Sequence, residues 1–174
     1  MEIRKGSIQD VDEVSALYDE LNGYLEKHEN FPGWRKGIYP AREDAEAGIS
    51  EGCLFVAVEN DRIAGTVILR HKPEKGYALA DWHCSFSYES ILVVYTLAVH
   101  PDFHHQGVGK KIMEFIIDYA SRKGMKAVRL DVYEKNAPAI RLYEKFGFCY
   151  IDTVDLGYSD YGLEKFKLYQ RILQ

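Results

Sequence analysis

The chain has 174 residues, enough for one compact domain with a hydrophobic core and short for two. Its formal net charge of −5 argues against a general nucleic-acid binder but leaves room for a local basic pocket for one anionic cofactor. The three cysteines form no CxxC pair, no apolar leader opens the chain, and the longest apolar run is too short to cross a bilayer. We therefore expect a single cytoplasmic domain over residues 1–174 that binds neither nucleic acid nor a membrane.

Short strands and helices alternate in the first half of the chain. Ser7 followed by Asp10 has the S-x-x-D form of a helix start, and apolar residues recur at helical spacing as far as Leu21. Two β-rich runs flank a polar turn at 60–62, which predicts a hairpin. Residues 71–90 show no readable pattern. The predicted order is a strand at 1–4, a helix from Ser7 to Leu21, a loop or broken helix over 22–40, a helix over 42–49, and strands over 53–59 and 63–70.

A buried strand and two helices organise the second half. The β-branched run at 91–99 predicts a strand buried on both faces. A helix over 107–123 carries a single apolar stripe and ends at Gly124, and Asn136 is the N-cap of another helix. This second helix runs through Phe146, and further strands are predicted over 128–132, 148–154 and 164–169. The order βααβββαβαββ predicts an α/β fold with helices flanking a mixed sheet of six to seven strands.

The stretch HHQGVGKK, residues 104–111, predicts a site for an anion. It opens a helix whose first N–H groups and dipole attract negative charge. Gly107 and Gly109 carry no Cβ that would keep a pyrophosphate from the backbone, and Lys110 and Lys111 add positive charge. The further glycines of a Walker A motif or a dinucleotide fingerprint are absent. Glycines that serve helix–strand packing, with merely solvated lysines, are the alternative.

A second motif, NAPAIRLYEKFGF at 136–148, lies about thirty residues downstream. Together with LAVHPDFHHQGVGKKIM at 97–113, it resembles the two core motifs of the GCN5-related N-acetyltransferases at the right separation. The resemblance covers about a third of the chain, and the order of the remaining elements suits that fold. It implies an acetyltransferase that uses acetyl-CoA and moves the acetyl group to a primary amine by direct attack in a ternary complex.

The resemblance also implies where acetyl-CoA binds. Backbone amides of residues 105–110 would hold the pyrophosphate, and the pantetheine arm would pair with Leu97 to Val99 in a gap beside the strand at 128–132. A backbone N–H near Leu97 would polarise the thioester carbonyl. His104 departs from the Arg or Gln usual in the family, and its imidazole is only a part-time cation. The implied cofactor contacts are Leu97, Ala98, Val99, His104, His105, Gln106, Gly107, Val108, Gly109, Lys110, Asn136, Ala139 and Tyr143.

Tyr143 and Asp131 are the candidate catalytic residues. Asn136 and Tyr143 are seven positions apart, which places them on one helix face about 10 Å apart along the axis. The resemblance implies that Tyr143 is the acid for the leaving thiolate, and a packed tyrosine is the alternative. Asp131 is the first candidate for the base that takes the amine proton, with Glu89 and Tyr95 as weaker ones. A role for Asp131 in orienting a loop or pairing with a lysine stays open.

The acceptor itself is not specified by the sequence. The aromatic segment 22–40 predicts a roof over the acceptor site, with Trp34, Tyr39 and Tyr95 as candidate contacts, or else local core. The acidic composition favours a cationic amine, either a small molecule or the terminus or a lysine of a protein. We expect no metal ion, because no carboxylate or thiol lies at ligand spacing around His104 and His105. A homodimer is compatible with the sequence, and the competing function is an acyl-CoA-binding sensor or structural module without turnover.

Overall fold

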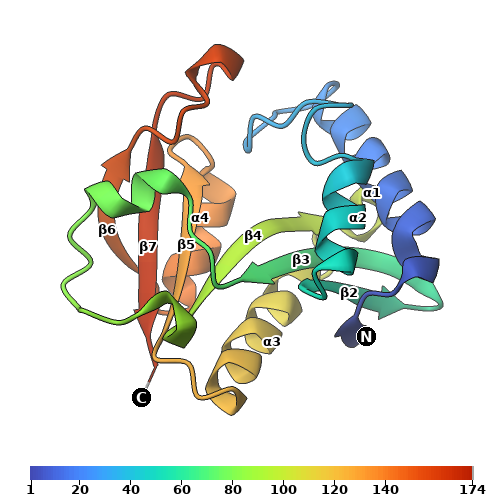
Figure 1. The fold of residues 1–174 in the computed structure, drawn as a ribbon. Coiled ribbons are helices and arrows are strands. Elements are labelled where there is room, and N and C mark those ends of the chain that lie inside the picture. Colours follow the sequence, from blue (N-terminus) through green and yellow to red (C-terminus); the bar gives the residue numbers. More distant parts are fainter. Residues whose placement is uncertain (174) are drawn as a thin grey trace. The chain divides into compact units, whose positions relative to one another are not determined.

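The computed structural model describes residues 1–173 (Figure 1). Its α-helices are α1 (Val11–Leu25), α2 (Arg42–Ser50), α3 (Val108–Arg122) and α4 (Ala137–Lys145). Its strands are β1 (Glu2–Lys5), β2 (Leu54–Glu59), β3 (Arg62–Arg70), β4 (Ile91–Val99), β5 (Ala127–Tyr133), β6 (Cys149–Val154) and β7 (Phe166–Ile172). Short 3₁₀ helices are η1 (Ile8–Asp10), η2 (Lys75–Leu79), η3 (Tyr88–Ser90), η4 (Pro101–Phe103) and η5 (Ser159–Tyr161).

The strands form one mixed sheet in the order β1-β2-β3-β4-β5-β7-β6. β4 and β5 run parallel, while the pairs β1–β2, β2–β3, β5–β7 and β6–β7 are antiparallel. The predicted α/β fold with a mixed sheet is therefore confirmed. No helix in the described part of the chain is both long and apolar enough to cross a membrane.

The chain folds as two compact units. Unit 1 contains β1, α1, α2, β2 and nearly all of β3, with the second half of β4 and the first part of α3. Unit 2 contains residues 31–33, 70–94 and 117–174. The expectation of one domain over residues 1–174 stays a prediction.

In unit 1, helices cover both faces of the β1–β3 ladder. The apolar residues of α1 recur every three or four positions and pack with Leu54 and Val56 of β2. Phe55, which points to the opposite face of β2, contacts Phe115 of α3 with ring centroids 5.2 Å apart. The α1 side of this core contains Val14, Leu17, Tyr18, Leu21, Leu25, Ala45, Leu54, Val56, Ile63, Ile68 and Ala98.

The helical segment starts after Ser7 as predicted, but its first turn is the 3₁₀ helix η1, α1 itself begins at Val11, and its end lies further on than expected. The backbone N–H of Ser7 donates to Asp10 Oδ2 at 2.7 Å, and Arg4 donates two hydrogen bonds of 2.8 Å to the same carboxylate. The helix then continues to Leu25, so residues 22–25 of the segment predicted as a loop or broken helix belong to α1. Asn22 is fully buried and its amide donates to the carbonyl of Pro40 at 3.1 Å, which holds this last turn in place.

In unit 2, α4 and the segment containing η2 lie on opposite faces of the sheet, as Figure 1 shows. Leu130 is the register partner of Tyr169, whose hydroxyl donates to Glu144 of α4 at 3.0 Å. The next residue, Asp131, therefore points to the other face, where the hydroxyl of Tyr77 donates to its Oδ2 at 2.7 Å. The strand alternation thus places Asp131 on the η2 side of β5.

β4 is a strand as predicted, but it is distorted at Thr96. This residue has φ 46°, a left-handed conformation that a β-branched residue adopts only under strain. The parallel register with β5 ends just before it, at Val94 opposite Leu130. Thr96 Oγ1 shares a hydrogen bond with the hydroxyl of Tyr39, which stabilises the unusual backbone. The distortion marks the point at which β4 stops pairing regularly with β5.

Candidate active site

The glycine loop of unit 1 has a backbone suited to an anion. His105 and Gly107 have φ values of 62° and 79°, so left-handed residues alternate in the loop that opens α3 at Val108. Such alternation turns successive N–H groups toward one side, and the first N–H groups of a helix also lack intrahelical acceptors. Sequence reasoning anticipated the need for glycine here, but not that His105 would share the left-handed conformation.

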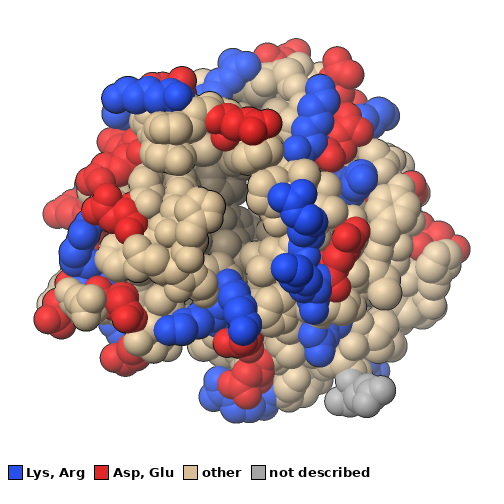
Figure 2. Space-filling model, turned by 180° about the vertical axis from the view of Figure 1, so that it is seen from behind, with Lys and Arg blue, Asp and Glu red and all other residues tan. Residues whose placement is uncertain are grey.

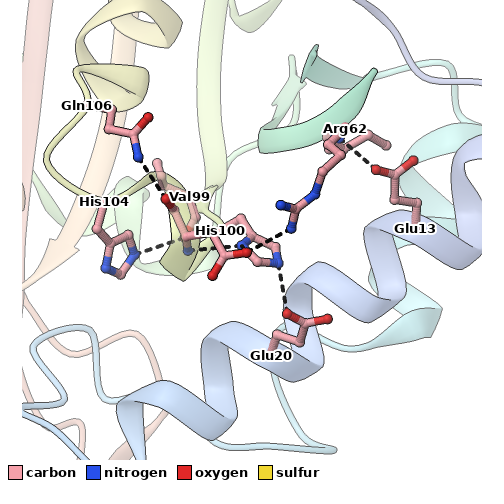
Figure 3. A network of polar contacts seen from close by, with 9 residues as sticks. Glu13, Glu20, Arg62, Val99, His100, His104 and Gln106 are labelled. Atoms are coloured by element: carbon pink, nitrogen blue, oxygen red, sulfur yellow. Dashed lines mark hydrogen bonds and ion pairs between the residues drawn. The ribbon is translucent and has the colours of Figure 1, made fainter. Parts of the chain in front are cut away.

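A buried histidine holds this loop in place (Figure 3). His100, 5% exposed, accepts a hydrogen bond at Nδ1 from the backbone N–H of Asp102, at 3.1 Å. Its Nε2 therefore carries the proton and donates to Glu20 of α1, at 2.9 Å. The carboxylate of Asp102 pairs with Arg62 at 2.9 Å, and Gln106 donates to the carbonyl of Asp102 at 2.7 Å. Sequence reasoning missed His100, because nothing in the sequence pairs it with a residue eighty positions away.

His104 points back toward β4. Its Nε2 lies 3.1 Å from the carbonyl oxygen of Val99 (Figure 3). Its ring stands edge-on to Tyr24 with centroids 5.1 Å apart. Burial lowers the pKa of His104, outweighing the hydrogen bond to Val99, which acts in the opposite direction. One ring nitrogen of His104 is therefore hydrogen-bonded within the protein. Contact of His104 with phosphate stays a prediction.

Two exposed lysines lie in the first turn of α3 although the chain as a whole is acidic. Lys110 pairs with Glu114 one turn along α3 at 3.7 Å, and Lys111 is exposed. Figure 2 shows that lysine and arginine atoms are plentiful on the face opposite to that of Figure 1. A local positive potential is thus compatible with the formal charge of −5.

Asp131 of unit 2 is half-buried and has the electrostatics of a base. The pKa of its carboxyl is raised to about 6, mainly by burial and to a smaller extent by the charge of Glu74, while the hydrogen bond from Tyr77 acts the other way. A carboxylate with this pKa is still mostly ionised at pH 7, yet it holds a proton about a hundredfold more tightly than an ordinary aspartate. Glu89, one of the two weaker candidates, is exposed in η3.

Tyr143 lies on α4, on the opposite side of β5 from the Tyr77 hydrogen bond. It is 8% exposed, and its pKa is raised by burial first and by the charge of Asp131 second. The phenol therefore keeps its proton throughout the neutral pH range. Among the described residues its hydroxyl has no hydrogen-bond partner, so the O–H group is free to donate to a ligand.

Asn136 caps α4 as predicted. Its side-chain oxygen accepts from the backbone N–H of Ala139 at 3.3 Å. The cap occupies Oδ1, so Nδ2 is the part of the Asn136 amide left to meet a pantetheine carbonyl. Contacts of Asn136 and Ala139 with a cofactor stay predictions.

The three aromatic candidates for acceptor contact all belong to unit 1. Trp34 stands edge-on to Tyr39 with centroids 5.8 Å apart, and Trp34 and Tyr95 both pack against the core beneath α1. The Tyr39 hydroxyl is bonded to Thr96, at the distortion of β4. Each ring is only partly buried, so local packing accounts for part of its surface and contact with an acceptor stays a prediction.

The described residues contain no group of three or more His, Cys, Asp or Glu side chains that could hold a metal ion. The sequence profile of the Acetyltransferase (GNAT) family matches residues 14–148, which is well over half of the chain. The chain belongs to the GNAT family. This membership confirms the resemblance seen in the motifs at 97–113 and 136–148.

Relatives of this GNAT chain include enzymes with known names. The [ribosomal protein bS18]-alanine N-acetyltransferase of Escherichia coli (strain K12) is 40% identical over 55 residues, which are 32% of this chain and 37% of that enzyme. The alignment thus spans little more than a third of the relative's length.

Solved structures share the fold across nearly the whole chain. An acetyltransferase of the GNAT family from Streptococcus agalactiae 2603 has a TM-score of 0.81 at 20% identity, covering 99% of this chain and 95% of that one. The protein yncA from Salmonella typhimurium, solved with its cofactor acetyl-CoA, has a TM-score of 0.68 at 20% identity, covering 100% and 94%. At these identities the likeness establishes the fold.

Proposed function

We propose that this GNAT protein transfers the acetyl group of acetyl-CoA to a primary amine by direct attack in a ternary complex. The observation that carries the proposal is the pair Asp131 and Tyr143 in unit 2. One is a carboxylate whose pKa is raised to about 6, and the other is a phenol whose raised pKa keeps it protonated. Two groups tuned in this way, one on each side of β5, favour an enzyme over an acyl-CoA sensor, which has no use for a base and an acid.

Asp131 supplies the base. A primary ammonium with a pKa of about 10.4 is neutral in only about one molecule in 2,500 at pH 7, a cost of about 4.6 kcal/mol. Asp131 takes the proton from the ammonium nitrogen, directly or through water, and leaves the lone pair free to attack the thioester carbonyl. The raised pKa of its carboxyl group makes this transfer less unfavourable than it would be with an exposed aspartate.

Tyr143 supplies a hydrogen bond at the other end of the reaction. The sulfur of CoA leaves as a thiolate, and by analogy with cysteine its conjugate acid has a pKa of about 8.5. The Tyr143 hydroxyl is protonated and free of other described partners, so it can donate to the sulfur as the C–S bond breaks.

The glycine loop and β4 of unit 1 hold the cofactor. The N–H groups between His105 and Lys110 receive the pyrophosphate, supported by the two left-handed residues of the loop. The pantetheine arm pairs with Leu97 to Val99, beyond the point at which the register of β4 with β5 ends. Because His104 already donates to the carbonyl of Val99, a pantetheine N–H would share that oxygen with the imidazole or displace it.

A cationic amine is the acceptor that the acidic composition favours. The relative from E. coli acts on an alanine of a ribosomal protein. The amino terminus of a protein is therefore one class of acceptor to test, beside small amines and lysine side chains. We place the reaction in the cytoplasm and assign it no metal ion.

The test is a panel of amines offered to the protein with a fixed concentration of acetyl-CoA, with release of free thiol as the readout. The panel includes a polyamine, an aminoglycoside, a lysine peptide and peptides with free amino termini. We expect at least one amine to raise thiol release well above the rate with water alone. Tight binding of acetyl-CoA without amine-dependent release would favour the sensor instead.

A further inference from the structure

We propose that Tyr77 is a positioning residue, which holds the Asp131 carboxylate so that one of its oxygens takes the proton of the acceptor amine. The inference rests on the proposed function and adds a residue to it. Tyr77 lies in η2, within the stretch 71–90 whose sequence has no readable pattern. It is fully buried, and its hydroxyl donates to Asp131 Oδ2 at 2.7 Å.

The hydrogen bond from Tyr77 makes the two oxygens of the Asp131 carboxylate inequivalent. Oδ2 is engaged by the phenol, so Oδ1 is the oxygen left for the amine or for a bridging water. A buried aromatic ring has few accessible rotamers, and the donor therefore fixes the direction of the carboxylate. Asp131 on β5 could otherwise rotate about its side-chain bonds and present either oxygen.

A second layer of buried contacts holds Tyr77 itself. The indole N–H of Trp82 donates to the carbonyl of Tyr77 at 2.8 Å, and the two rings lie 5.2 Å apart. The guanidinium of Arg129 stacks on Trp82 with 4.0 Å to the ring centroid, and Gln170 donates to the carbonyl of Trp82 at 3.1 Å. Arg129 and Asp131 are alternate residues of β5, so the layer that fixes Tyr77 is anchored on the strand that carries the base.

The same hydrogen bond also lowers the pKa of the Asp131 carboxyl group. Burial and the carboxylate of Glu74, which precedes η2, oppose ionisation of Asp131, while the Tyr77 hydroxyl favours it. Tyr143, on the other side of β5, is neutral. Arg129 lies on the same face of β5 as Asp131, but its guanidinium is directed to Gln170, Tyr88 and Cys84. Loss of the Tyr77 hydroxyl should therefore make Asp131 hold its proton more tightly, which moves its titration to higher pH.

The experiment follows the Asp131 carboxyl carbon by ¹³C NMR as a function of pH, in the wild type and in Tyr77→Phe. Asp131→Asn assigns the signal. Tyr169→Phe is the matched control, because Tyr169 is equally buried and its hydroxyl donates to a carboxylate, that of Glu144, at 3.0 Å on the α4 side of the sheet. Phenylalanine keeps the buried ring in both variants, so packing is preserved.

We expect the Asp131 midpoint to rise by about half a unit or more in Tyr77→Phe and to stay in place in Tyr169→Phe. The acidic limb of the kcat/KM profile for the best amine should move in the same direction, with kcat lowered about tenfold and the affinity for acetyl-CoA unchanged. An unmoved midpoint, or an equal shift in both variants, overturns the inference.

A readout that leaves Tyr77 intact guards against loss of folding in the variant. The phenol carbon of Tyr77 should change its chemical shift as Asp131 titrates in the wild type, and this change should vanish in Asp131→Asn. Its persistence there would contradict the inference. Because neither NMR titration needs turnover, a failed amine panel would reject the proposed function while the coupling of Tyr77 to Asp131 is still measured separately.

Discussion

The buried surroundings of Asp131 give the protein a pH-dependent stability that can be measured. The pKa of this carboxyl is raised from an unfolded value near 3.8 to about 6 in the fold. Below pH 4 both states hold the proton and the group costs nothing. As pH rises from 4 to 6 the unfolded chain ionises first, so folding loses up to about 3 kcal/mol, and the loss is complete above the folded pKa.

Asp131→Asn should therefore be more stable than the wild type at pH 8 and nearly equal to it at pH 4. Asparagine keeps an oxygen that can accept from Tyr77 but has no proton to lose. The difference in midpoint temperature between the two proteins, measured by calorimetry across this range, checks the sign. A difference that is the same at both pH values would mean that Asp131 ionises normally in the fold.

Tyr143→Phe should lower turnover by about ten- to a thousandfold, with little change in the affinity for acetyl-CoA. The hydroxyl has no described partner in the protein, so its removal leaves the packing of α4 intact and deletes only the donor to the leaving sulfur. Steady-state kinetics with the best amine, and calorimetry with acetyl-CoA, separate the two effects. Unchanged turnover would show that the thiolate leaves without this acid.

At this scale, the sequence predicted the residues that belong to a motif or to strand alternation. Tyr143 follows from the motif at 136–148, and Asp131 from its place on the strand beside it. Tyr77 could not be predicted, because it meets Asp131 from 54 positions away in a stretch without periodicity. The role of His100 could not be predicted either, since its partner Glu20 lies in α1, far away in the sequence.

At the scale of the element, α3 begins and ends at left-handed glycines, which gives a matched test of the anion loop. Gly107 and Gly124 have φ values of 79° and 67°, and a Cβ on either would meet no atom within 4 Å. Alanine at each position therefore costs only backbone strain, about 1–2 kcal/mol. The two variants should lose similar stability.

Their affinities for acetyl-CoA should differ. Gly107→Ala disturbs the N–H groups that receive the pyrophosphate and should weaken binding about tenfold or more, whereas Gly124→Ala at the far end of α3 should bind as the wild type does. Calorimetric titration with acetyl-CoA gives both values. Equal affinity in the two variants would place the pyrophosphate away from this loop.

The start of α1 depends on one carboxylate. Arg4 and Ser7 donate to Asp10 and hold the pKa of that carboxyl far below its usual value. Because the folded pKa is depressed, the stabilisation is present above about pH 4 and is lost as pH falls. Asp10→Asn should cost about 1–2 kcal/mol at pH 7, and this cost should shrink below pH 4.

Urea denaturation of Asp10→Asn at pH 7 and pH 3.5 measures this cost. The control is Asp12→Asn in the same turn, since Asp12 is largely exposed and its ion pair with Arg42 is screened by solvent. If the two variants lose the same stability at pH 7, the carboxylate of Asp10 does not fix the start of α1.

Sequence patterns predicted an element at the place of each described α-helix and strand, and tertiary contacts account for the differences in their bounds and geometry. The last turn of α1 carries glycine and asparagine, which read as a loop, yet Asn22 is buried against the segment that ends at Pro40. The distortion of β4 was invisible, because Thr96 is a good strand former and only its neighbours hold it at φ 46°. Both exceptions lie where segments distant in sequence meet.

At the scale of the whole molecule, two motifs at a set separation predicted the fold and the cofactor, and the family match over residues 14–148 agrees with the family they indicated. The acceptor could not be predicted in the same way. The candidate contacts Trp34 and Tyr39 belong to segment 22–40, whose sequence carries turns and aromatic residues without a repeating pattern. The relative from E. coli is aligned over only 32% of this chain, so its substrate remains one class among several to test.

The central claim is that the acetyl group passes from CoA to an amine nitrogen. The most direct measurement uses acetyl-CoA labelled with ¹³C in the acetyl group and follows the label by NMR in the presence of the amine panel. We predict that the label appears as an acetamide on at least one amine, at a rate that falls in both Asp131→Asn and Tyr143→Phe. Label that stays on CoA, or appears only as acetate with every amine, would contradict the claim.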